Sequence, residues 1–319
     1  MKLDKRSRFG STELSVTPLC LGTSAWGPPR QGESDDDAHE RIASLADAFF
    51  AGTLATNFLD TSNEYGQSLS EIQVGAAIRR TDGIAPGLVV QTKLDRDTET
   101  GNFTAARMWR SLEESQQRLG LERFPILYLH DPENIGFEAA MAPGGPVEAL
   151  LEMKARGNAQ YIGISGGPVD MLQRFVETDL FDALITHNRF TLVDQSADIL
   201  LDAATQRTMA ISNAAPYGGG VLTGEARFRG TYGYRPIMPE VQAAIDSMAR
   251  TCAKANVSLA AAALQFSLQD PRIHSTIVGI SSLAGMNRAV TEASEEISAS
   301  LWNELKNLRP PDFALDQVR

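Results

Sequence analysis

A chain of 319 residues suits two average domains or one large α/β barrel. Its 29 basic and 40 acidic residues give a formal net charge of −11, so nucleic acid is not an expected partner. The charged amino terminus lacks the apolar core of a signal peptide, and the most apolar run, residues 259–268, is far shorter than the roughly 20 residues of a membrane span. Two cysteines in separate apolar contexts, Cys20 and Cys252, fit a reducing compartment, so we expect a cytoplasmic protein.

The chain begins with a predicted hairpin and continues as a repeated strand-helix unit. Residues 6–17 alternate around Gly10-Ser11, which predicts the hairpin. The predicted strands cover residues 18–23, 58–60, 88–93, 126–130, 161–165, 183–187, 208–213 and 276–279. The predicted helices cover residues 35–50, 68–80, 104–119, 146–156, 169–178, 195–206, 239–255, 258–269 and a stretch from residue 282. Residues 298–319 start as an amphipathic helix and end in a proline-broken tail, which we expect on the outside of the barrel.

The predicted strands end at a nearly constant interval. The first five ends fall at Thr23, Asp60, Lys93, His130 and Ser165. Strands and helices that alternate at this interval imply parallel strands with right-handed crossovers, and eight such units close most simply into a TIM barrel. We therefore predict one α/β domain over residues 1–319, a (β/α)8 barrel with an amino-terminal β-hairpin cap and a carboxy-terminal helix.

Ionisable residues end three successive strands. Asp60, Lys93 and His130 occupy these ends, and Tyr65 lies in the loop that follows Asp60. The ends and their loops converge in a barrel, where an ammonium stabilises a nearby phenolate and a carboxylate keeps the ammonium charged. Taken singly, the four residues suit a turn cap, a solvated lysine, a core histidine and a packing tyrosine. Their coincidence at four converging positions favours a tunable acid/base site.

Six motifs in one order make the chain resemble the aldo-keto reductase superfamily. They are LGTSAWG at 21–27, NFLDTSNEYG at 57–66, QTKL at 91–94, LYLHDPE at 127–133, YIGIS at 161–165 and GGGVLTG at 218–224. The resemblance implies a (β/α)8 barrel that transfers hydride between a nicotinamide cofactor and a carbonyl or alcohol. It assigns Tyr65 as general acid/base, Lys93 as its pKa partner, Asp60 as the support of Lys93, and His130 as the residue that orients the substrate oxygen.

The same resemblance implies a set of cofactor-binding positions and no metal. They are Gly22, Thr23, Ser165, His187, Asn188, Ala214, Pro216, Gly218, Gly220, Leu222, Gly279, Ser281, Ser282 and Arg288. Three departures from the family pattern stand out: Gly166 replaces an Asn, His187-Asn188 occupies the region of a Gln, and Ala214 replaces a Tyr that stacks on the nicotinamide. The glycines at 218–220 leave backbone amides open to a pyrophosphate.

The segment after the last strand bears on the choice between NAD and NADP. The family usually has a basic residue before a Ser there, whereas this chain reads Ile280-Ser281-Ser282. Without that cation a 2′-phosphate lacks charge-assisted hydrogen bonds. The sequence therefore predicts NAD over NADP, with Arg288 as the one nearby residue in the sequence that can oppose this preference.

Two motifs narrow the resemblance to one branch of the superfamily. NRFTLVDQ at 188–195 and NAAPYGGGVLTG at 213–224 resemble aldose 1-dehydrogenases, such as L-fucose and D-threo-aldose dehydrogenases, and a pyridoxal dehydrogenase. Such enzymes oxidise a cyclic hemiacetal to a lactone with NAD(P). Expected substrate contacts are Trp26, Tyr65 and His130, together with Phe228 and Tyr232 as either substrate faces or loop anchors. Residues 131–147 are interpreted as a loop that suits a lid.

Other functions are consistent with parts of the pattern. A general aldehyde or ketone reductase, or a pyridoxal dehydrogenase, would use the same four residues. A barrel lyase would use Lys93 as a Schiff-base nucleophile. A cofactor-sensing binding module would share the fold, although retention of all four residues argues against it. The resemblance implies a monomer or weak homo-oligomer that acts on a small-molecule sugar or carbonyl.

Overall fold

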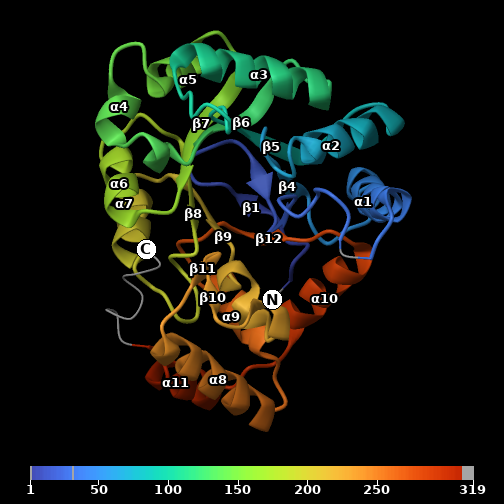
Figure 1. Cartoon of the computed structure of the whole chain (residues 1–319), viewed down its shortest axis with the longest axis vertical. Helices are drawn as coiled ribbons and strands as arrows, with labels where there is room; N and C mark the ends of the chain where they lie inside the picture. The colour runs from blue at the N-terminus through green and yellow to red at the C-terminus, as the bar shows by residue number, and fades with distance from the viewer. Residues whose placement is uncertain (1, 31, 311–319) are drawn as a thin grey trace.

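The computed structural model describes residues 2–30 and 32–310. Eight parallel strands form a closed barrel in the order β12-β3-β4-β5-β6-β7-β8-β9 (Figure 1). They are β3 (Leu19–Gly22), β4 (Phe58–Asp60), β5 (Val89–Leu94), β6 (Phe124–His130), β7 (Ala159–Gly166), β8 (Ala183–His187), β9 (Ala210–Ala214) and β12 (Ser275–Gly279). The predicted α/β barrel is confirmed, with each strand within a few residues of its predicted position.

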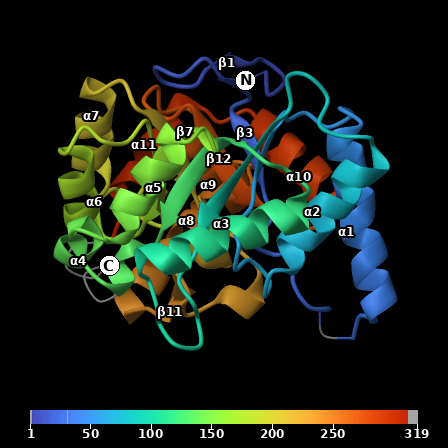
Figure 2. The same cartoon turned by 90° about the horizontal axis from the view of Figure 1, so that it is seen from above.

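Helices are arranged around the barrel in Figure 1, and in the view turned by 90° they lie in front of the strands and beside them (Figure 2). They are α1 (Asp35–Phe50), α2 (Leu69–Arg80), α3 (Ala105–Leu119), α5 (Pro146–Ala155), α6 (Val169–Val176), α7 (Asp198–Gln206), α9 (Leu259–Leu268) and α10 (Leu283–Ser294). The predicted carboxy-terminal helix is α11 (Ala299–Asn307), which packs on α8 (Pro239–Lys254) through Leu301 and Leu305. Ser or Thr caps α1, α3, α9, α10 and α11, where its hydroxyl accepts a backbone N–H of the first turn.

The amino-terminal hairpin closes one end of the barrel. Strand β1 (Ser7–Arg8) pairs with β2 (Ser15–Val16), and Phe9 between them is fully buried against Phe58, with ring centroids 5.3 Å apart. Gly10 has a φ of +56°, and a Cβ there would lie 2.4 Å from the backbone N of Ala210, so only glycine fits. The hairpin therefore seals the barrel interior from below, as the sequence predicts.

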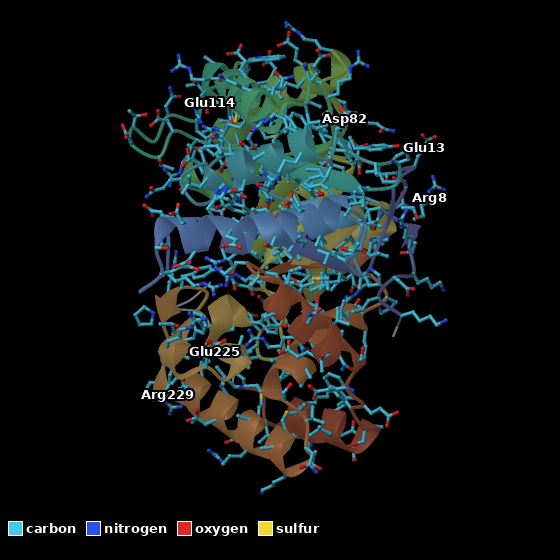
Figure 3. All side chains as sticks on the ribbon, turned by 90° about the vertical axis from the view of Figure 1, so that its right-hand side faces the viewer. Arg8, Glu13, Asp82, Glu114, Glu225 and Arg229 are labelled. Carbon is cyan, nitrogen blue, oxygen red and sulfur yellow. The ribbon has the colours of Figure 1, made fainter. Side chains whose placement is uncertain are left out.

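The long segments at the opposite end carry more structure than the sequence suggests. Between β9 and α8 the chain forms two short turns, η2 (Gly218–Thr223) and η3 (Ala226–Phe228), then a hairpin of β10 (Thr231–Tyr232) and β11 (Arg235–Pro236). Figure 3 places Glu225 and Arg229 of this segment at the end of the molecule opposite Arg8 and Glu13 of the hairpin.

Residues 131–147, interpreted from the sequence as a loop, contain η1 (Pro132–Asn134) and α4 (Phe137–Met141). Phe137 packs on Phe175 of α6 with ring centroids 4.7 Å apart, and the Arg174 guanidinium lies 3.9 Å from its ring centroid. The sequence prediction missed α4 because five residues are too few to show helical periodicity. The segment is therefore anchored to the barrel wall through an aromatic contact.

Two further expectations concern membrane spans and the carboxy-terminal tail. No helix in residues 2–30 and 32–310 has both the length and the apolar composition to cross a membrane. The proline-broken tail that the sequence predicts falls mostly on residues 311–319, which lie outside the described residues.

Close packing of α2 on α3 generates a stability prediction. A Cβ at Gly75 would lie 1.9 Å from the carbonyl oxygen of Arg118, so Gly75→Ala forces the two helices apart. We expect the free energy of unfolding to fall by about 2–3 kcal/mol despite the better helix propensity of Ala. Urea denaturation checks this, with Gly285→Ala in α10 as the matched control, because its nearest contact would be 3.3 Å. Equal stability of both variants and the wild type would contradict the packing argument.

Candidate active site

A buried ion pair links the ends of β4 and β5. Lys93 Nζ donates to Asp60 Oδ2 at 2.7 Å and to the Thr61 carbonyl at 2.9 Å, and both charged side chains are at most 2% exposed. The other carboxylate oxygen, Asp60 Oδ1, accepts from Gln91 Nε2 at 2.8 Å. The third Lys93 contact is Tyr65 Oη, at 3.1 Å. The structure thus brings Asp60, Tyr65 and Lys93 into one hydrogen-bonded group, as their positions in the sequence predict.

The loop that carries Tyr65 is held by hydrogen bonds from helix α3. Arg118 of α3 donates to the Asn63 carbonyl at 2.9 Å, and Arg107 donates to Asn63 Oδ1 at 3.2 Å. Directly after Tyr65, Gly66 has a φ of +61°, and a Cβ there would lie 2.6 Å from the Cα of Gly27. The loop therefore passes too close to the β3–α1 segment for any residue but glycine.

Tyr65 is a neutral phenol in this environment. Burial raises its pKa well above the usual value of a tyrosine, and the carboxylates of Asp60, Asp131 and Asp95 raise it further. The Lys93 ammonium opposes these effects, because a positive charge 3.1 Å from Oη stabilises the phenolate. Tyr65 is therefore a proton donor at neutral pH, and it becomes a base only where additional positive charge or alkaline pH assists.

His130 lies beside Tyr65 and is held from behind by a carboxylate. The two rings meet edge to face, with centroids 5.6 Å apart. His130 Nδ1 lies 2.6 Å from Asp95 Oδ1, and Asp95 is 6% exposed. Ser62 donates to the other Asp95 oxygen and also lies 3.1 Å from His130 Nδ1. With Nδ1 committed to Asp95, the Nε2 of His130 is the ring nitrogen left to contact a substrate.

The charge on His130 follows from its neighbours. Burial disfavours the protonated ring, but Asp131 and Asp95 outweigh it and raise the pKa of His130 to about 9. In turn, although burial opposes ionisation of Asp131, the positive charge on His130 and the hydrogen bond to His187 hold the pKa of Asp131 well below its usual range. At neutral pH the site therefore contains an imidazolium next to a neutral phenol.

Three of the expected cofactor positions lie near the ends of β7, β8 and β9, which follow β6 around the barrel. Ser165 of β7 pairs with His130 in register, and His187 and Ala214 pair at the ends of β8 and β9. Asn188 follows His187 with a φ of +58°, and its buried Oδ1 has no protein partner. The Thr23 hydroxyl donates its proton to the Asp60 carbonyl at 2.9 Å. Thr23 therefore links the segment after β3 to β4.

Glu133 accounts for the glycine at position 166. A Cβ at Gly166 would lie 2.8 Å from Glu133 Oε2, so this carboxyl fills the space that a side chain at 166 would take. Glu133 Oε1 accepts the Gly167 amide at 3.0 Å, whereas the buried Oε2 has no protein partner. Burial raises the pKa of Glu133, and the charge of Asp131 raises it further. A polar group therefore remains available at the end of β7.

The glycine turn after β9 is ordered by packing. Gly218, Gly219 and Gly220 all have positive φ, and a Cβ at 218 or 220 would collide with the rings of Tyr232 and Phe228. This differs from the expectation of open amides, because Gly218 donates its amide to Ala215 and Gly220 to Tyr217. Leu222 is fully buried as well, so contact through its side chain is not available.

Two arginines from distant sequence reach the segment after β12. Arg30 donates to Ser281 Oγ, and Arg41 of α1 donates to the Ser281 carbonyl while forming an ion pair with Glu33. Burial and the positive charge of Arg41 lower the pKa of Arg30. Ser282 caps α10, whereas Arg288 is 64% exposed and its guanidinium is 4.0 Å from Glu225. Arg30 thus brings a guanidinium to Ser281, a contact that the local sequence around Ile280 does not show.

Comparison with known proteins agrees with this geometry. The profile described as "Aldo/keto reductase family" matches residues 18–310. The chain belongs to the aldo/keto reductase family. It is therefore an oxidoreductase that acts on CH–OH groups of small molecules, and the resemblance predicted from the motifs is confirmed.

Named relatives of this aldo/keto reductase share between a quarter and a third of their residues with it. A D-threo-aldose 1-dehydrogenase of Pseudomonas is 32% identical over 93% of this chain and 95% of the relative. An L-galactose dehydrogenase of Arabidopsis thaliana is 29% identical, covering 100% of this chain and 96% of the relative. A pyridoxal 4-dehydrogenase of Microbacterium luteolum is 24% identical, covering 96% and 98%.

A solved structure shares the fold of this reductase. The holo form of an aldo-keto reductase from Bacillus halodurans superposes with a TM-score of 0.72 at 18% identity, covering 96% of each chain. At this identity the likeness speaks for the barrel architecture alone.

The aromatic residues expected at the substrate are mostly buried. Trp26 is fully buried in this reductase, and its indole N–H donates to the Ile280 carbonyl at 2.7 Å. Tyr232 is also fully buried, and its hydroxyl donates to the Asn188 carbonyl at 2.9 Å, so it is a loop anchor. Tyr234, two residues further on, is 76% exposed with a φ of +69°. Trp26 therefore joins the loops after β3 and β12, and its contact with substrate stays a prediction.

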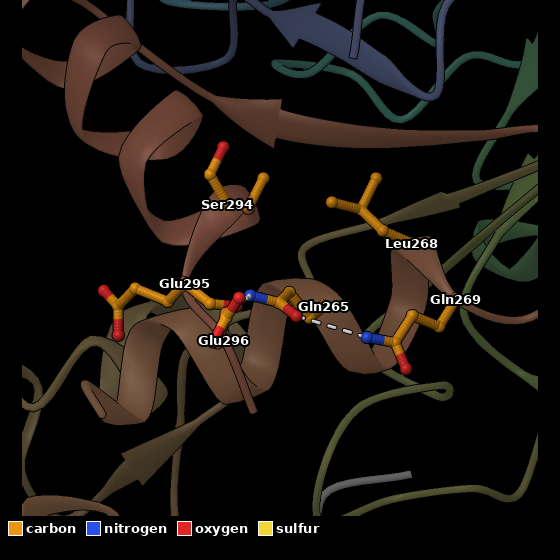
Figure 4. A pocket seen from close by; sticks show the side chains of 7 residues that line it. Gln265, Leu268, Gln269, Ser294, Glu295 and Glu296 are labelled. Atoms are coloured by element: carbon orange, nitrogen blue, oxygen red, sulfur yellow. Dashed lines mark hydrogen bonds between the residues drawn. The ribbon is translucent and has the colours of Figure 1, made fainter. Parts of the chain in front are cut away.

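Two further features of the described residues are a surface hollow and a cluster of ionisable side chains near the strand ends. A hollow of about 240 Å³ lies between α9 and the end of α10, lined by Gln265, Leu268, Gln269 and residues 293–296 (Figure 4). None of its residues ends a barrel strand. Asp131, Glu133 and His187 bring ligand atoms within 4.8 Å of one another, a spacing that also arises from the contact of His187 with Asp131 at 3.5 Å. That contact explains the proximity of His187 and Asp131, and Glu133 joins them from η1, directly after Asp131.

The sequence reading missed four site residues: Asp95, Asp131, Glu133 and Arg30. Asp95 was detectable, because it follows the strand end at Lys93 by two residues and the strand-end argument applies to it. Asp131 and Glu133 lie within a quoted motif but carry no separate signal. Arg30 was not detectable, since its partner Ser281 is 251 residues away.

The buried ion pair generates a second prediction. Lys93→Met leaves the Asp60 carboxylate buried without its cation, and we expect the free energy of unfolding to fall by about 3–5 kcal/mol. Asp60→Asn destabilises as well, and the double variant loses less than the sum. Urea denaturation of the four proteins measures the coupling. The control is the exposed pair of Arg80 and Asp47, where Arg80→Ala costs less than about 1 kcal/mol. Additive losses at 60 and 93 would refute the coupling.

Proposed function

We propose that this reductase is an NAD(P)-dependent aldose dehydrogenase, which oxidises the hydroxyl of a cyclic hemiacetal to a lactone. The observation that carries the proposal is the placement of Tyr65 Oη 3.1 Å from Lys93 Nζ and beside His130. Two relatives are a D-threo-aldose 1-dehydrogenase and an L-galactose dehydrogenase, which supports a sugar as substrate.

The cofactor end of the site fits a nicotinamide dinucleotide. Glu133 Oε2 and Asn188 Oδ1 are buried acceptors without a protein partner at the ends of β7 and β8, and a carboxamide NH₂ supplies the donors that they lack. Arg30, near Ser281, supplies positive charge for a phosphate, and its own charge is destabilised by Arg41 until an anion approaches. Bound there, the cofactor supplies the hydride acceptor.

The residues of the chain handle the proton. Tyr65 as phenolate accepts the proton of the anomeric hydroxyl, while His130 Nε2–H donates a hydrogen bond to the same oxygen and fixes it. Lys93 stabilises the phenolate form of Tyr65, and Asp60 holds Lys93 charged and oriented. In the reverse direction Tyr65 donates its phenol proton to the carbonyl oxygen. The isolated protein favours this neutral phenol form, because the pKa of Tyr65 is raised.

A pyridoxal dehydrogenase is the second candidate, since a pyridoxal 4-dehydrogenase is a relative over nearly the whole chain. Screening NAD reduction with aldoses and pyridoxal at mildly alkaline pH separates the two substrates. The Schiff-base alternative is disfavoured, because Lys93 is 1% exposed and its ammonium is held by Asp60. An amine nucleophile must lose that proton and reach a carbonyl carbon.

Removing the Tyr65 hydroxyl tests the mechanism. We expect Tyr65→Phe to lower kcat for aldose oxidation by about 10²-fold or more, the contribution of a positioned acid/base, while the Kd for NAD changes less than about twofold. Stopped-flow absorbance and cofactor fluorescence measure the two quantities. Tyr161→Phe is the matched control, because the Tyr161 hydroxyl accepts from the Glu13 amide at the hairpin end. Turnover above about a tenth of wild type in Tyr65→Phe would overturn the assignment.

Arg30 provides a test of cofactor choice. We propose that NAD remains preferred because Ile280 stands where the family has a cation, and that Arg30 supplies the remaining contact to a 2′-phosphate. Arg30→Met should raise the Kd of NADP(H) about tenfold, the value of one charge-assisted hydrogen bond, and that of NAD(H) less than about twofold. Arg229→Met is the control, since Arg229 pairs with Asp246. Equal changes for both cofactors would contradict a role at the 2′-phosphate, and tighter wild-type binding of NADP(H) would contradict the NAD preference.

A further inference from the structure

The Asp95 carboxylate has three hydrogen-bond partners at the carboxyl end of the barrel. Its Oδ2 accepts from the Ser62 hydroxyl and from the Glu64 amide at 3.1 Å, and its Oδ1 lies 2.6 Å from His130 Nδ1. Its own amide donates to Ser111 Oγ at 3.0 Å. The carboxylate is thus held by partners from β6 and from the loop after β4, while Ser111 of α3 holds the backbone.

The hydrogen bond determines which nitrogen of His130 carries a proton. An ionised carboxylate offers only acceptors, so Nδ1 must be the donor in this contact. Although burial alone would raise the pKa of Asp95, the charge and hydrogen bond of His130, the Ser62 hydroxyl and the Glu64 amide lower it. The ring is therefore held with Nδ1–H toward Asp95 and Nε2 toward the substrate side.

Other charged groups face His130 from every packed element. Asp131 Oδ1 lies 3.6 Å from Nε2 on the open side, and His187 of β8 shares that carboxylate. Lys93 of β5 disfavours the imidazolium, and Tyr65 is neutral. Asp131 is 37% exposed whereas Asp95 is buried, so water screens the Asp131 charge more strongly. The contact of His130 with Asp95 is therefore the less screened of the two.

We propose that Asp95 is a positioning residue, which fixes the tautomer of His130 and keeps the ring protonated at neutral pH, so that Nε2–H is a permanent donor to the substrate oxygen. The proposal rests on the function proposed above, in which His130 orients that oxygen. Ser62 and the Glu64 amide in turn orient Asp95, because both donate to its Oδ2 and leave Oδ1 toward Nδ1 of His130.

The test is Asp95→Asn, an isosteric change that removes the charge. Histidine side-chain NMR of the protein without cofactor or substrate follows the titration of His130, which the His130→Gln variant identifies among the four histidines. In the wild type we expect His130 to titrate near pH 9, and in Asp95→Asn about one unit lower or more. The matched control is Asp97→Asn, because Asp97 is exposed and caps only the following turn.

Steady-state kinetics supply the second readout. We expect kcat of Asp95→Asn to fall about 10²-fold with KM for the cofactor unchanged. We also expect the rate of carbonyl reduction to begin its alkaline decrease at a lower pH than in the wild type, since a His130 with a lower pKa loses its proton at a lower pH. Wild-type His130 that titrates below pH 7 overturns the proposal even if the variant fails to fold. An unchanged titration in Asp95→Asn, or unchanged kcat and pH profile, also overturns it. Absence of turnover with every aldose and carbonyl, with the NMR shift present, overturns the proposed function instead.

Discussion

The buried ion pair between Lys93 and Asp60 is the interaction on which the rest of the site depends. Two charges with almost no solvent contact are stable only if each is fully satisfied, and here Gln91, the Thr61 carbonyl and Tyr65 complete the set. Parallel neighbours β4 and β5 bring the two side chains together, because Asp60 ends β4 opposite Gln91 and Lys93 lies two residues further along β5, on the same face as Gln91. The barrel thus places the two partners side by side, and the pair in turn fixes where Tyr65 stands.

A second charged pair, His130 with Asp95, continues this arrangement to the next strand. The loop after β4 serves both pairs, since it presents Tyr65 to Lys93 and Ser62 to Asp95. The network of Asn63 with Arg107 and Arg118 holds this loop from the side of α3. A change in α3, far from the reacting oxygen, therefore bears on the acid/base group as well as on stability.

Sequence reasoning predicts what periodicity and strand ends determine. The eight strands follow from the spacing, and Asp60, Tyr65, Lys93 and His130 follow from their places at converging ends. It does not predict the individual hydrogen bonds of side chains. The buried indole N–H of Trp26 donates to the Ile280 carbonyl, a bond that no local pattern indicates, while the contact of Trp26 with substrate stays a prediction. Arg30 and Ser281 meet only because β12 closes the barrel beside β3, a contact that no local pattern encodes.

The space beside Gly166 is occupied by a side chain from another element. Glu133, from the turn after β6, projects its carboxyl into the space where a side chain at 166 would stand, so Gly166 and Glu133 form a compensating pair. With Asn present the Glu133 carboxyl would be displaced, and with Gly166 alone the buried polar position would be empty. Burial favours the neutral carboxyl, which both donates and accepts, as an amide does. The Glu133 carboxyl therefore places hydrogen-bonding groups at the end of β7, where position 166 itself has no side chain.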